Sequence, residues 1–232
     1  MAPVRGVFFD LYRTLLVADD VQALRRDWLA AVQGTLARRG YEIDVERLGE
    51  GFPDLFTRPE PPPADDGLTV LERRLARLCR ELGLKVASRD LPALSAAAVA
   101  AWGRHFRLDA EALPLLQALY GRAELALISN FDQPAHVRQT LAETGLGRYF
   151  ATVTISGELG VRKPDPAIFR PALAASRLPP AEVVYVGDSA EDVAGARAAG
   201  IRPVRIDRGG RHDGGDGVPT IRRLAELPAL LG

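Results

Sequence analysis

The chain has 232 residues, of which 47% are hydrophobic and 26% are charged, proportions that are ordinary for a globular protein. Its 30 basic residues equal its 30 acidic residues, so the formal net charge is zero, which argues against bulk electrostatic binding to nucleic acid or to an anionic membrane. The longest apolar runs are much shorter than the ~20 residues of a membrane-spanning helix. Because no signal-peptide pattern precedes the first predicted strand, we expect a cytoplasmic protein.

An apolar run near the start of the chain, Val7-Phe8-Phe9, stops at Asp10. Such a run is typical of a strand that is buried on both faces of a sheet. A carboxylate at the C-terminal end of such a strand lies where open α/β sheets place their ligands. Asp10 is therefore the candidate for the centre of a site.

The segment that follows shows helical spacing of apolar residues and no strand pattern. Its lone cysteine, Cys79, has no partner for an intramolecular disulfide and is expected to be an inert thiol on an amphipathic helix. The proline-rich segment 59–67 is expected to be a surface loop. The expected helices cover residues 21–39, 45–56 with a break at Pro53, 68–82 and 94–106.

From Asp109 onward, predicted helices and strands alternate, which indicates right-handed βαβ units and a parallel sheet. The first strand is too apolar to stand alone and is expected in the same sheet. The sequence therefore predicts an α/β core of residues 1–16 and 109–232, with an all-helical domain inserted at 17–108. The later strands are expected at 124–128, 151–155, 183–186 and 203–206, and the helices at 110–120, 134–144 (closed by Gly145), 165–176, 189–199 and 220–230.

Polar residues stand where several of these predicted strands end. Asp10, Ser129 with Asn130, and Asp188 each follow a strand, and Lys163 lies in a further polar cluster just before a helix. Because parallel strands bring their carboxyl ends to one edge of the sheet, we expect these side chains to share a crevice.

The residue types predict a nucleophilic carboxylate beside a cation site. Asp10 is the candidate nucleophile, which forms a covalent aspartyl intermediate that water then hydrolyses. Asp10 and Asp188 make a hard oxygen site suited to Mg²⁺, completed by the backbone carbonyl of Tyr12 and by waters. Lys163 places a positive charge near the nucleophile, and Asp192 is expected to orient it.

Other residues of this edge are candidates for substrate binding. Ser129, Asn130 and neighbouring backbone N–H groups are expected to hold phosphate oxygens. Thr14 is expected to support the loop or to hydrogen-bond Asp10, and Tyr12 is a further candidate substrate contact. The histidines show no metal-ligand spacing and are expected to have surface or core roles; they are His105, His136 and His212.

This set of motifs resembles that of the haloacid dehalogenase superfamily of hydrolases. The residues that match the four family motifs are Asp10 with Thr14, Ser129, Lys163, and Gly187-Asp188 with Asp192. The resemblance implies a Rossmann-like sheet whose first strand lies between those that bear Ser129 and Asp188. It also implies a helical cap inserted just after the first motif.

Two residues depart from the pattern of the phosphatases in this superfamily, which have Asp and Gly where this chain has Tyr12 and Arg13. The missing Asp is the general acid and base, a role typically worth ~10²–10⁴ in rate. A tyrosine, with an ordinary pKa near ~10, is a poor base at neutral pH. The resemblance leaves Arg13 either binding an anion or pointing to solvent.

The superfamily's 2-haloacid dehalogenases do have tyrosine at the position of Tyr12, because a halide leaving group needs no proton. They use no metal, however, and lack a pair such as Gly187-Asp188. These dehalogenases also have an arginine in the cap that binds the carboxylate of the substrate. It cannot be matched to any one of Arg25, Arg26, Arg38 and Arg39.

The sequence favours a Mg²⁺-dependent hydrolase that acts on a small phosphorylated metabolite through an aspartyl-phosphate. The alternatives are a 2-haloacid dehalogenase and a non-catalytic protein that binds an anion and a metal. The expected partner is a small-molecule phosphate ester, with no nucleic acid or membrane; the substrate and the oligomeric state are left open.

Overall fold

The computed structural model describes residues 2–18, 20–57, 66–210 and 215–232, so His212 and most of the predicted proline-rich loop lie outside the described residues. The chain divides into two compact units. Unit 1 comprises residues 1–17 and 107–232, and unit 2 comprises residues 18–106.

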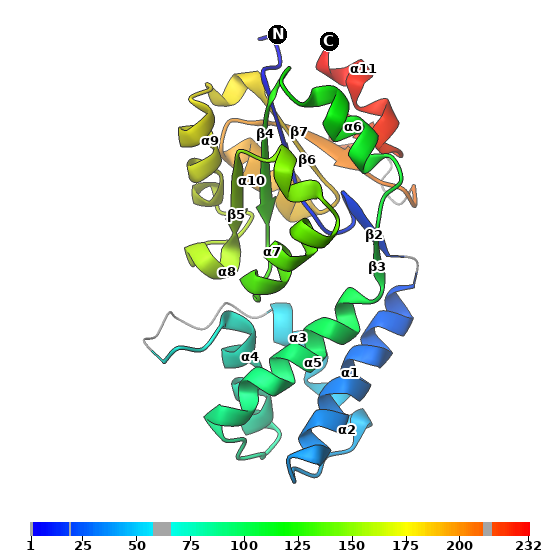
Figure 1. The fold of residues 1–232 in the computed structure, drawn as a ribbon, viewed down its shortest axis with the longest axis vertical. Coiled ribbons are helices and arrows are strands. Elements are labelled where there is room, and N and C mark those ends of the chain that lie inside the picture. Colours follow the sequence, from blue (N-terminus) through cyan, green and yellow to red (C-terminus); the bar gives the residue numbers. More distant parts are fainter. Residues whose placement is uncertain (1, 19, 58–65, 211–214) are drawn as a thin grey trace. The chain divides into compact units, whose positions relative to one another are not determined.

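Unit 1 is built on a six-stranded parallel sheet (Figure 1). The first strand lies between the strands that end at Ser129 and at Gly187, which is the central position that the resemblance implied. The predicted α/β class with a parallel sheet is confirmed. In spatial order the strands are β5 (Thr152–Ile155), β4 (Glu124–Ser129), β1 (Gly6–Phe9), β6 (Val183–Gly187), β7 (Arg202–Ile206) and β8 (Thr220–Ile221).

Helices flank this sheet because the side chains of its central strands are apolar on both faces. On one face of the sheet, Phe8, Ile128 and Tyr185 pack against Phe169 and Ala196. Phe169 immediately precedes α9, and Ala196 lies in α10. Figure 1 shows α6 and α7 in front of the sheet. The helices of unit 1 are α6 (Ala112–Leu119), α7 (Pro134–Glu143), α8 (Ser156–Leu159), α9 (Arg170–Ser176), α10 (Ala190–Ala198) and α11 (Pro228–Leu231). As expected, Gly145 ends α7 in the left-handed region, with φ 70°.

Unit 2 is helical and has its own apolar core around Trp28, Leu36, Leu75 and Leu94. A capping box starts α4, because Thr69 and Glu72 accept hydrogen bonds from each other's backbone N–H. The helices are α1 (Val21–Arg38), α2 (Val45–Glu50), α3 (Phe52–Thr57), α4 (Val70–Glu81) and α5 (Leu91–Gly103). Burial raises the pKa of the Cys79 thiol to about 11, which agrees with an inert thiol.

Several predicted element boundaries were wrong. Two short strands, β2 (Leu16–Ala18) and β3 (Phe106–Leu108), pair with each other where a strand-free helical insert was predicted. The break between α2 and α3 falls at Gly51 rather than Pro53, which sits in the first turn of α3, where a missing N–H costs little.

The predicted final helix was also wrong at its start. Thr220–Ile221 is the edge strand β8, and a 3₁₀ turn at Leu224–Glu226 precedes the short α11. Strands of two or three residues give too little alternation for a pattern to detect.

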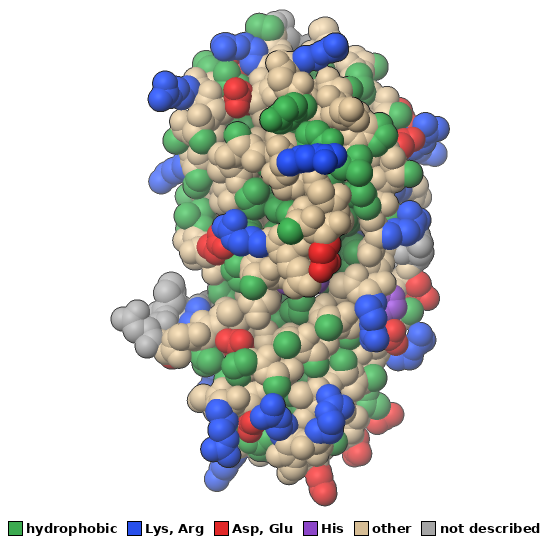
Figure 2. All heavy atoms as spheres, viewed as in Figure 1, with side chains coloured by type: hydrophobic (Ala, Val, Ile, Leu, Met, Phe, Trp, Pro, Cys, Tyr) green, Lys and Arg blue, Asp and Glu red, His purple; other side chains and the backbone are tan. Residues whose placement is uncertain are grey.

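On the face shown in Figure 2, acidic and basic side chains are interspersed, as the zero net charge leads one to expect. Among the described residues, no helix combines the length and the apolar character that crossing a membrane requires.

Candidate active site

The register of the sheet sets the position of Asp10. Phe9 pairs with Leu127 of β4 and Val186 of β6, so the next residue, Asp10, comes level with the ends of both neighbouring strands. The Asp10 N–H donates to Val186 O at 2.9 Å, which continues the ladder by one bond. The Asp10 side chain is 9% exposed, so a carboxylate lies almost fully buried at this edge.

The Lys163 ammonium contacts four polar groups of the site. Its Nζ lies 2.7 Å from Asp10 Oδ1 and 2.7 Å from Asp192 Oδ1. The same ammonium donates to Ile128 O at 3.1 Å and lies 2.9 Å from the Tyr185 hydroxyl oxygen. With 3% exposure, this lysine is buried and satisfied entirely by protein groups.

Burial and charge shift the pKa values of these groups. Burial raises the pKa of Asp10 to about 7; Lys163 opposes this rise, whereas Asp192 and Asp188 add to it. Burial lowers the pKa of Lys163, but Asp10 and Asp192 raise it by more, so its net pKa is above the ordinary value. The site therefore keeps a charged lysine and holds an excess of negative charge.

Three carboxylates converge at this edge. One oxygen from each of Asp10, Asp188 and Asp192 lies within 4.8 Å of the other two, and no further acidic or histidine group of this kind occurs among the described residues. Asp192 is already engaged, because Oδ1 contacts Lys163 and Oδ2 accepts from Ser189 N and Oγ. Clustered carboxylate oxygens of this kind are the donors that Mg²⁺ prefers, so these three aspartates are candidates to hold a metal ion.

The position before Asp188 has no room for a side chain, which explains why it is glycine, Gly187. A Cβ at this position would meet the Cγ and Cβ of Asp192 at distances that real contacts do not show. Asp192 reaches Lys163 through the space that glycine leaves.

The predicted substrate-binding residues differ in their surroundings. The Ser129 hydroxyl is buried and has no hydrogen-bond partner among the described residues. Thr14 is buried, and its hydroxyl lies 3.4 Å from Asp10 Oδ2. The Asn130 side chain instead spans Lys163, accepting from its N–H at 2.9 Å and donating to its carbonyl at 3.1 Å, and it also contacts Glu191. Its amide thus holds the lysine's backbone.

Tyr12 lies in an aromatic stack. Its ring stacks on Phe131, with centroids 4.9 Å apart, and lies parallel to the ring of His136 at 6.5 Å. Burial raises the pKa of the Tyr12 phenol further above its usual value. The phenol therefore holds its proton at neutral pH and is unsuited to act as a base.

Sequence reasoning did not identify Tyr185 as part of this site. Its hydroxyl lies 3.0 Å from Asp192 Oδ1 and 3.1 Å from Ile128 O, and it contacts the Lys163 ammonium. The signal was present, since Tyr185 is the only polar side chain within an aliphatic strand, Val183-Val184-Tyr185-Val186.

We expect Tyr185→Phe to lower the free energy of unfolding by only about 1 kcal/mol. The loss is modest because Lys163 still contacts both Asp192 Oδ1 and Ile128 O. Urea denaturation followed by circular dichroism measures it, with Tyr149→Phe as the matched control, since the Tyr149 hydroxyl accepts a hydrogen bond from the exposed Arg148. A loss above about 3 kcal/mol would contradict this view and mean that the hydroxyl is the dominant partner of the buried charges.

The structure adds the contacts of two arginines in or beside the turn that follows Asp10. Arg13, for which anion binding and solvent exposure were both left open, forms an ion pair between its Nε and Asp188 Oδ2 at 2.9 Å. Arg208, which was not predicted, donates to the carbonyls of Arg13 and Thr14 and pairs with Asp109 at 2.6 Å.

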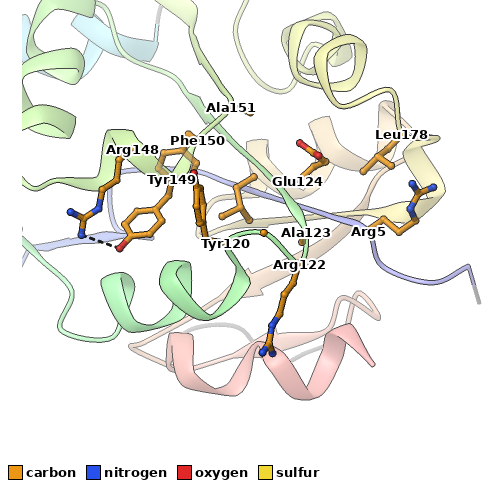
Figure 3. Close-up of a pocket in the computed structure, with 12 residues that line it drawn as sticks. Arg5, Tyr120, Arg122, Ala123, Glu124, Arg148, Tyr149, Phe150, Ala151 and Leu178 are labelled. Carbon is orange, nitrogen blue, oxygen red and sulfur yellow. Dashed lines mark hydrogen bonds between the residues drawn. The ribbon is translucent and has the colours of Figure 1, made fainter.

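A hollow of about 510 Å³ lies at the opposite, N-terminal edge of the sheet (Figure 3). Arg5, Arg122 and Arg148 line it together with Tyr120 and Tyr149. Arg5 pairs with Glu182, and Arg148 lies over the Tyr149 ring and donates to its hydroxyl. Its surroundings share no residue with the Asp10 cluster.

The family sequence model described as haloacid dehalogenase-like hydrolase matches residues 4–200. A phosphoserine phosphatase from Thermus thermophilus is 44% identical over 115 residues, which are 49% of this chain and 45% of that relative. The chain thus spans about half the length of this relative.

Two solved structures cover nearly the whole chain. A HAD phosphatase from Thermococcus onnurineus is 25% identical with a TM-score of 0.70, covering 99% of this chain and 98% of that one. A 2-haloacid dehalogenase from Pseudomonas syringae pv. Tomato is 26% identical with a TM-score of 0.71, covering 98% of each chain. The family match, the parallel sheet with its central first strand, and the buried Asp10–Lys163 pair agree, and the chain belongs to the haloacid dehalogenase-like hydrolases.

Proposed function

We propose that this chain is a Mg²⁺-dependent hydrolase of small phosphate esters that uses Asp10 as its nucleophile. The observation that carries the proposal is the buried Asp10 carboxylate, held at 2.7 Å by Lys163 with the carboxylate of Asp188 within 4.8 Å. A structural role alone would not need three converging carboxylates, two of them on one buried lysine, because burying charge is costly.

In this proposal an Asp10 oxygen attacks phosphorus while the ester P–O bond breaks, and its electron pair leaves with the alcohol oxygen, which takes up a proton from water. Water then attacks the aspartyl-phosphate, which releases inorganic phosphate and restores the carboxylate. Lys163 holds Asp10 Oδ1 and keeps one positive charge beside the transferred group. Bound Mg²⁺, held by Asp10, Asp188 and the Tyr12 carbonyl, would supply charge neutralisation between nucleophile and phosphate.

Ser129 supports a phosphate site beside the nucleophile. Its hydroxyl is fully buried at the end of the strand next to β1 and has no hydrogen-bond partner among the described residues. A buried hydroxyl without a partner is costly unless a ligand satisfies it. In this proposal a phosphate oxygen is that ligand. Asn130 acts through Lys163, whose backbone it holds.

The substrate proposed is a small phosphorylated metabolite. The similarity to the Thermus phosphoserine phosphatase supports this class. Because Tyr12 keeps its proton, the chain is expected to favour esters whose alcohol leaves readily. Unit 2 is proposed to act as the cap that selects the substrate.

Tyr12 also favours a second candidate, 2-haloacid dehalogenase. The aromatic stack on Phe131 would suit a leaving halide that needs no proton, and a solved 2-haloacid dehalogenase is among the similar structures. Asp188 opposes this candidate, since its carboxylate would repel a haloacid.

One set of assays separates these functions. The purified chain and Asp10→Asn are each assayed on p-nitrophenyl phosphate, ethyl phosphate and 2-chloropropionate, with Mg²⁺ or with chelator. Phosphate release that needs both Mg²⁺ and Asp10 supports the proposal. Halide release indifferent to chelator would establish the dehalogenase instead, and phosphate binding without turnover would leave a binding protein.

We expect Tyr12→Asp to raise kcat/KM for ethyl phosphate by about tenfold or more, because it adds a carboxyl group that can protonate the leaving oxygen. Tyr12→Asn is the matched control, since it removes the same ring and offers no exchangeable acid. The comparison is made between these two variants, so that the cavity left by the ring cancels. Equal rates in the two would show that the absent acid does not limit the site.

A further inference from the structure

Arg13 occupies a backbone conformation that its side chain does not favour. Its φ is 62°, in the left-handed region, and Arg177 is the only other non-glycine residue with positive φ in the described parts of the chain. Arg177 closes α9, where that conformation is ordinary. Arg13 instead lies in the turn three residues after the proposed nucleophile, and strain of this kind concentrates at functional sites.

The turn is held from outside, so the strain does not relax. Arg208 donates through Nη1 to the Arg13 carbonyl and through Nη2 to the Thr14 carbonyl, and Asp109 pairs with the same guanidinium. The backbone of Arg13 is therefore fixed, and with it the point from which its side chain extends.

The Arg13 side chain is anchored at one end only. Its Nε lies 2.9 Å from Asp188 Oδ2, while the side chain as a whole is 50% exposed, against 10% for Asp188. No described residue accepts a hydrogen bond from its two Nη groups. A planar fork of N–H donors, fixed at Nε and open at its end, is suited to bind a carboxylate in bidentate fashion.

The direction of attack places a leaving group on this open side. Phosphoryl transfer requires the attacking and leaving oxygens roughly in line across phosphorus. Asp10 is buried at the sheet edge, so the alcohol departs away from that edge, and the half-exposed Arg13 side chain extends from its anchor on Asp188, whose carboxylate lies within 4.8 Å of that of Asp10. In the proposed function, the buried Lys163 and the buried Ser129 hydroxyl already bind the transferred phosphoryl group.

We propose that Arg13 recognises a carboxylate on the leaving group, so that the preferred substrates are phosphate monoesters of short hydroxy acids. This inference rests on the proposed function. Arg13 acts as a specificity residue, and its pairing with Asp188 orients the guanidinium.

The test compares two ligand pairs that differ only by a carboxylate: phosphoglycolate with ethyl phosphate as substrates, and phosphonoacetate with ethylphosphonate as non-hydrolysable ligands. Arg13→Gly removes the guanidinium and tolerates φ 62°, so the turn keeps its shape. Arg13→Lys keeps a charge without the fork. Arg177→Gly, the same substitution at the other left-handed arginine, is the control. All assays use saturating Mg²⁺, and calorimetry measures the affinities.

We expect Arg13→Gly to lower the ratio of kcat/KM for phosphoglycolate over ethyl phosphate at least tenfold, chiefly through KM. Arg13→Lys should recover part of this ratio, and Arg177→Gly should leave it unchanged. An equal loss on both substrates would overturn the inference, because Arg13 would then act on the phosphoryl group.

The binding arm keeps the two proposals apart. If Arg13→Gly removes the preference for phosphonoacetate but no substrate is turned over, carboxylate recognition by Arg13 stands as a property of binding, and the hydrolase proposal fails together with the substrate preference. If phosphate is released but no carboxylate preference depends on Arg13, the hydrolase proposal stands and the inference fails.

Discussion

Lys163→Met is expected to lower the free energy of unfolding by about 3–5 kcal/mol at pH 8, the largest effect on stability of any substitution considered. The lysine is the shared partner of two buried carboxylates, and its removal leaves Asp10 and Asp192 facing each other within 4.8 Å. Methionine fills much of the same volume, so the loss reports charge rather than a cavity.

The pH dependence identifies the cause. Without Lys163, the pKa values of both aspartates rise in the folded state, so folding favours their neutral forms. The variant is therefore closest to the parent in acid and loses stability as the pH rises through the raised pKa values. A loss that does not change between pH 5 and pH 8 would contradict the electrostatic explanation.

Lys85→Met is the matched control, because Lys85 is exposed and is the only other lysine in the sequence. Urea denaturation should be followed by circular dichroism. Trp28 and Trp102, the only tryptophans, both lie in unit 2, so their fluorescence would report that unit alone.

Asp10→Asn is expected to reduce phosphate release by at least about 10³-fold, because an amide cannot form the covalent intermediate. The same substitution should not destabilise the metal-free fold, and at pH 8 it should raise the melting temperature. Burial raises the pKa of Asp10 to about 7, so its surroundings favour the neutral form, which asparagine imitates.

The stability difference between Asp10→Asn and the parent should depend on pH. A carboxyl group with a raised folded-state pKa contributes stability that is present below its ordinary pKa and is lost as the pH rises through about 7. The melting temperature of Asp10→Asn relative to the parent, measured in chelator, should therefore grow from pH 5 to pH 8. A parent that is more stable than the variant at pH 8 would show that the ion pair with Lys163 outweighs burial.

The positions of Asp10, Ser129 and Asp188 at one sheet edge could be predicted, because parallel strands align their carboxyl ends and each of these residues ends an apolar run. Lys163 follows no strand, so its place beside Asp10 was expected only from the polar cluster before a helix and from the family resemblance, not from the end of a strand. The structure brings the lysine and the carboxylates together.

Other features could not be read from the sequence, because they depend on contacts between distant segments. Alternation along β6 shows which face Tyr185 occupies but not that its hydroxyl reaches Lys163, 22 residues earlier. Arg208 acts on a turn 194 residues away, and no local pattern links the two. The pairing of Arg13 with Asp188 depends on a backbone conformation that arginine rarely adopts.

The pairing of β2 with β3 means that the chain leaves unit 1 and returns to it along adjacent hydrogen-bonded backbones. Unit 2 is therefore an insertion whose two ends lie side by side. Its length adds little to the entropic cost of bringing β1 together with the rest of the sheet, since that cost grows only slowly with loop length. We therefore expect that another helical segment with equally close ends could replace the residues between β2 and β3 without altering the register of β1 with β4 and β6. On the proposal that unit 2 selects the substrate, such a replacement would change selectivity while the Asp10 carboxylate and its partners stay in place.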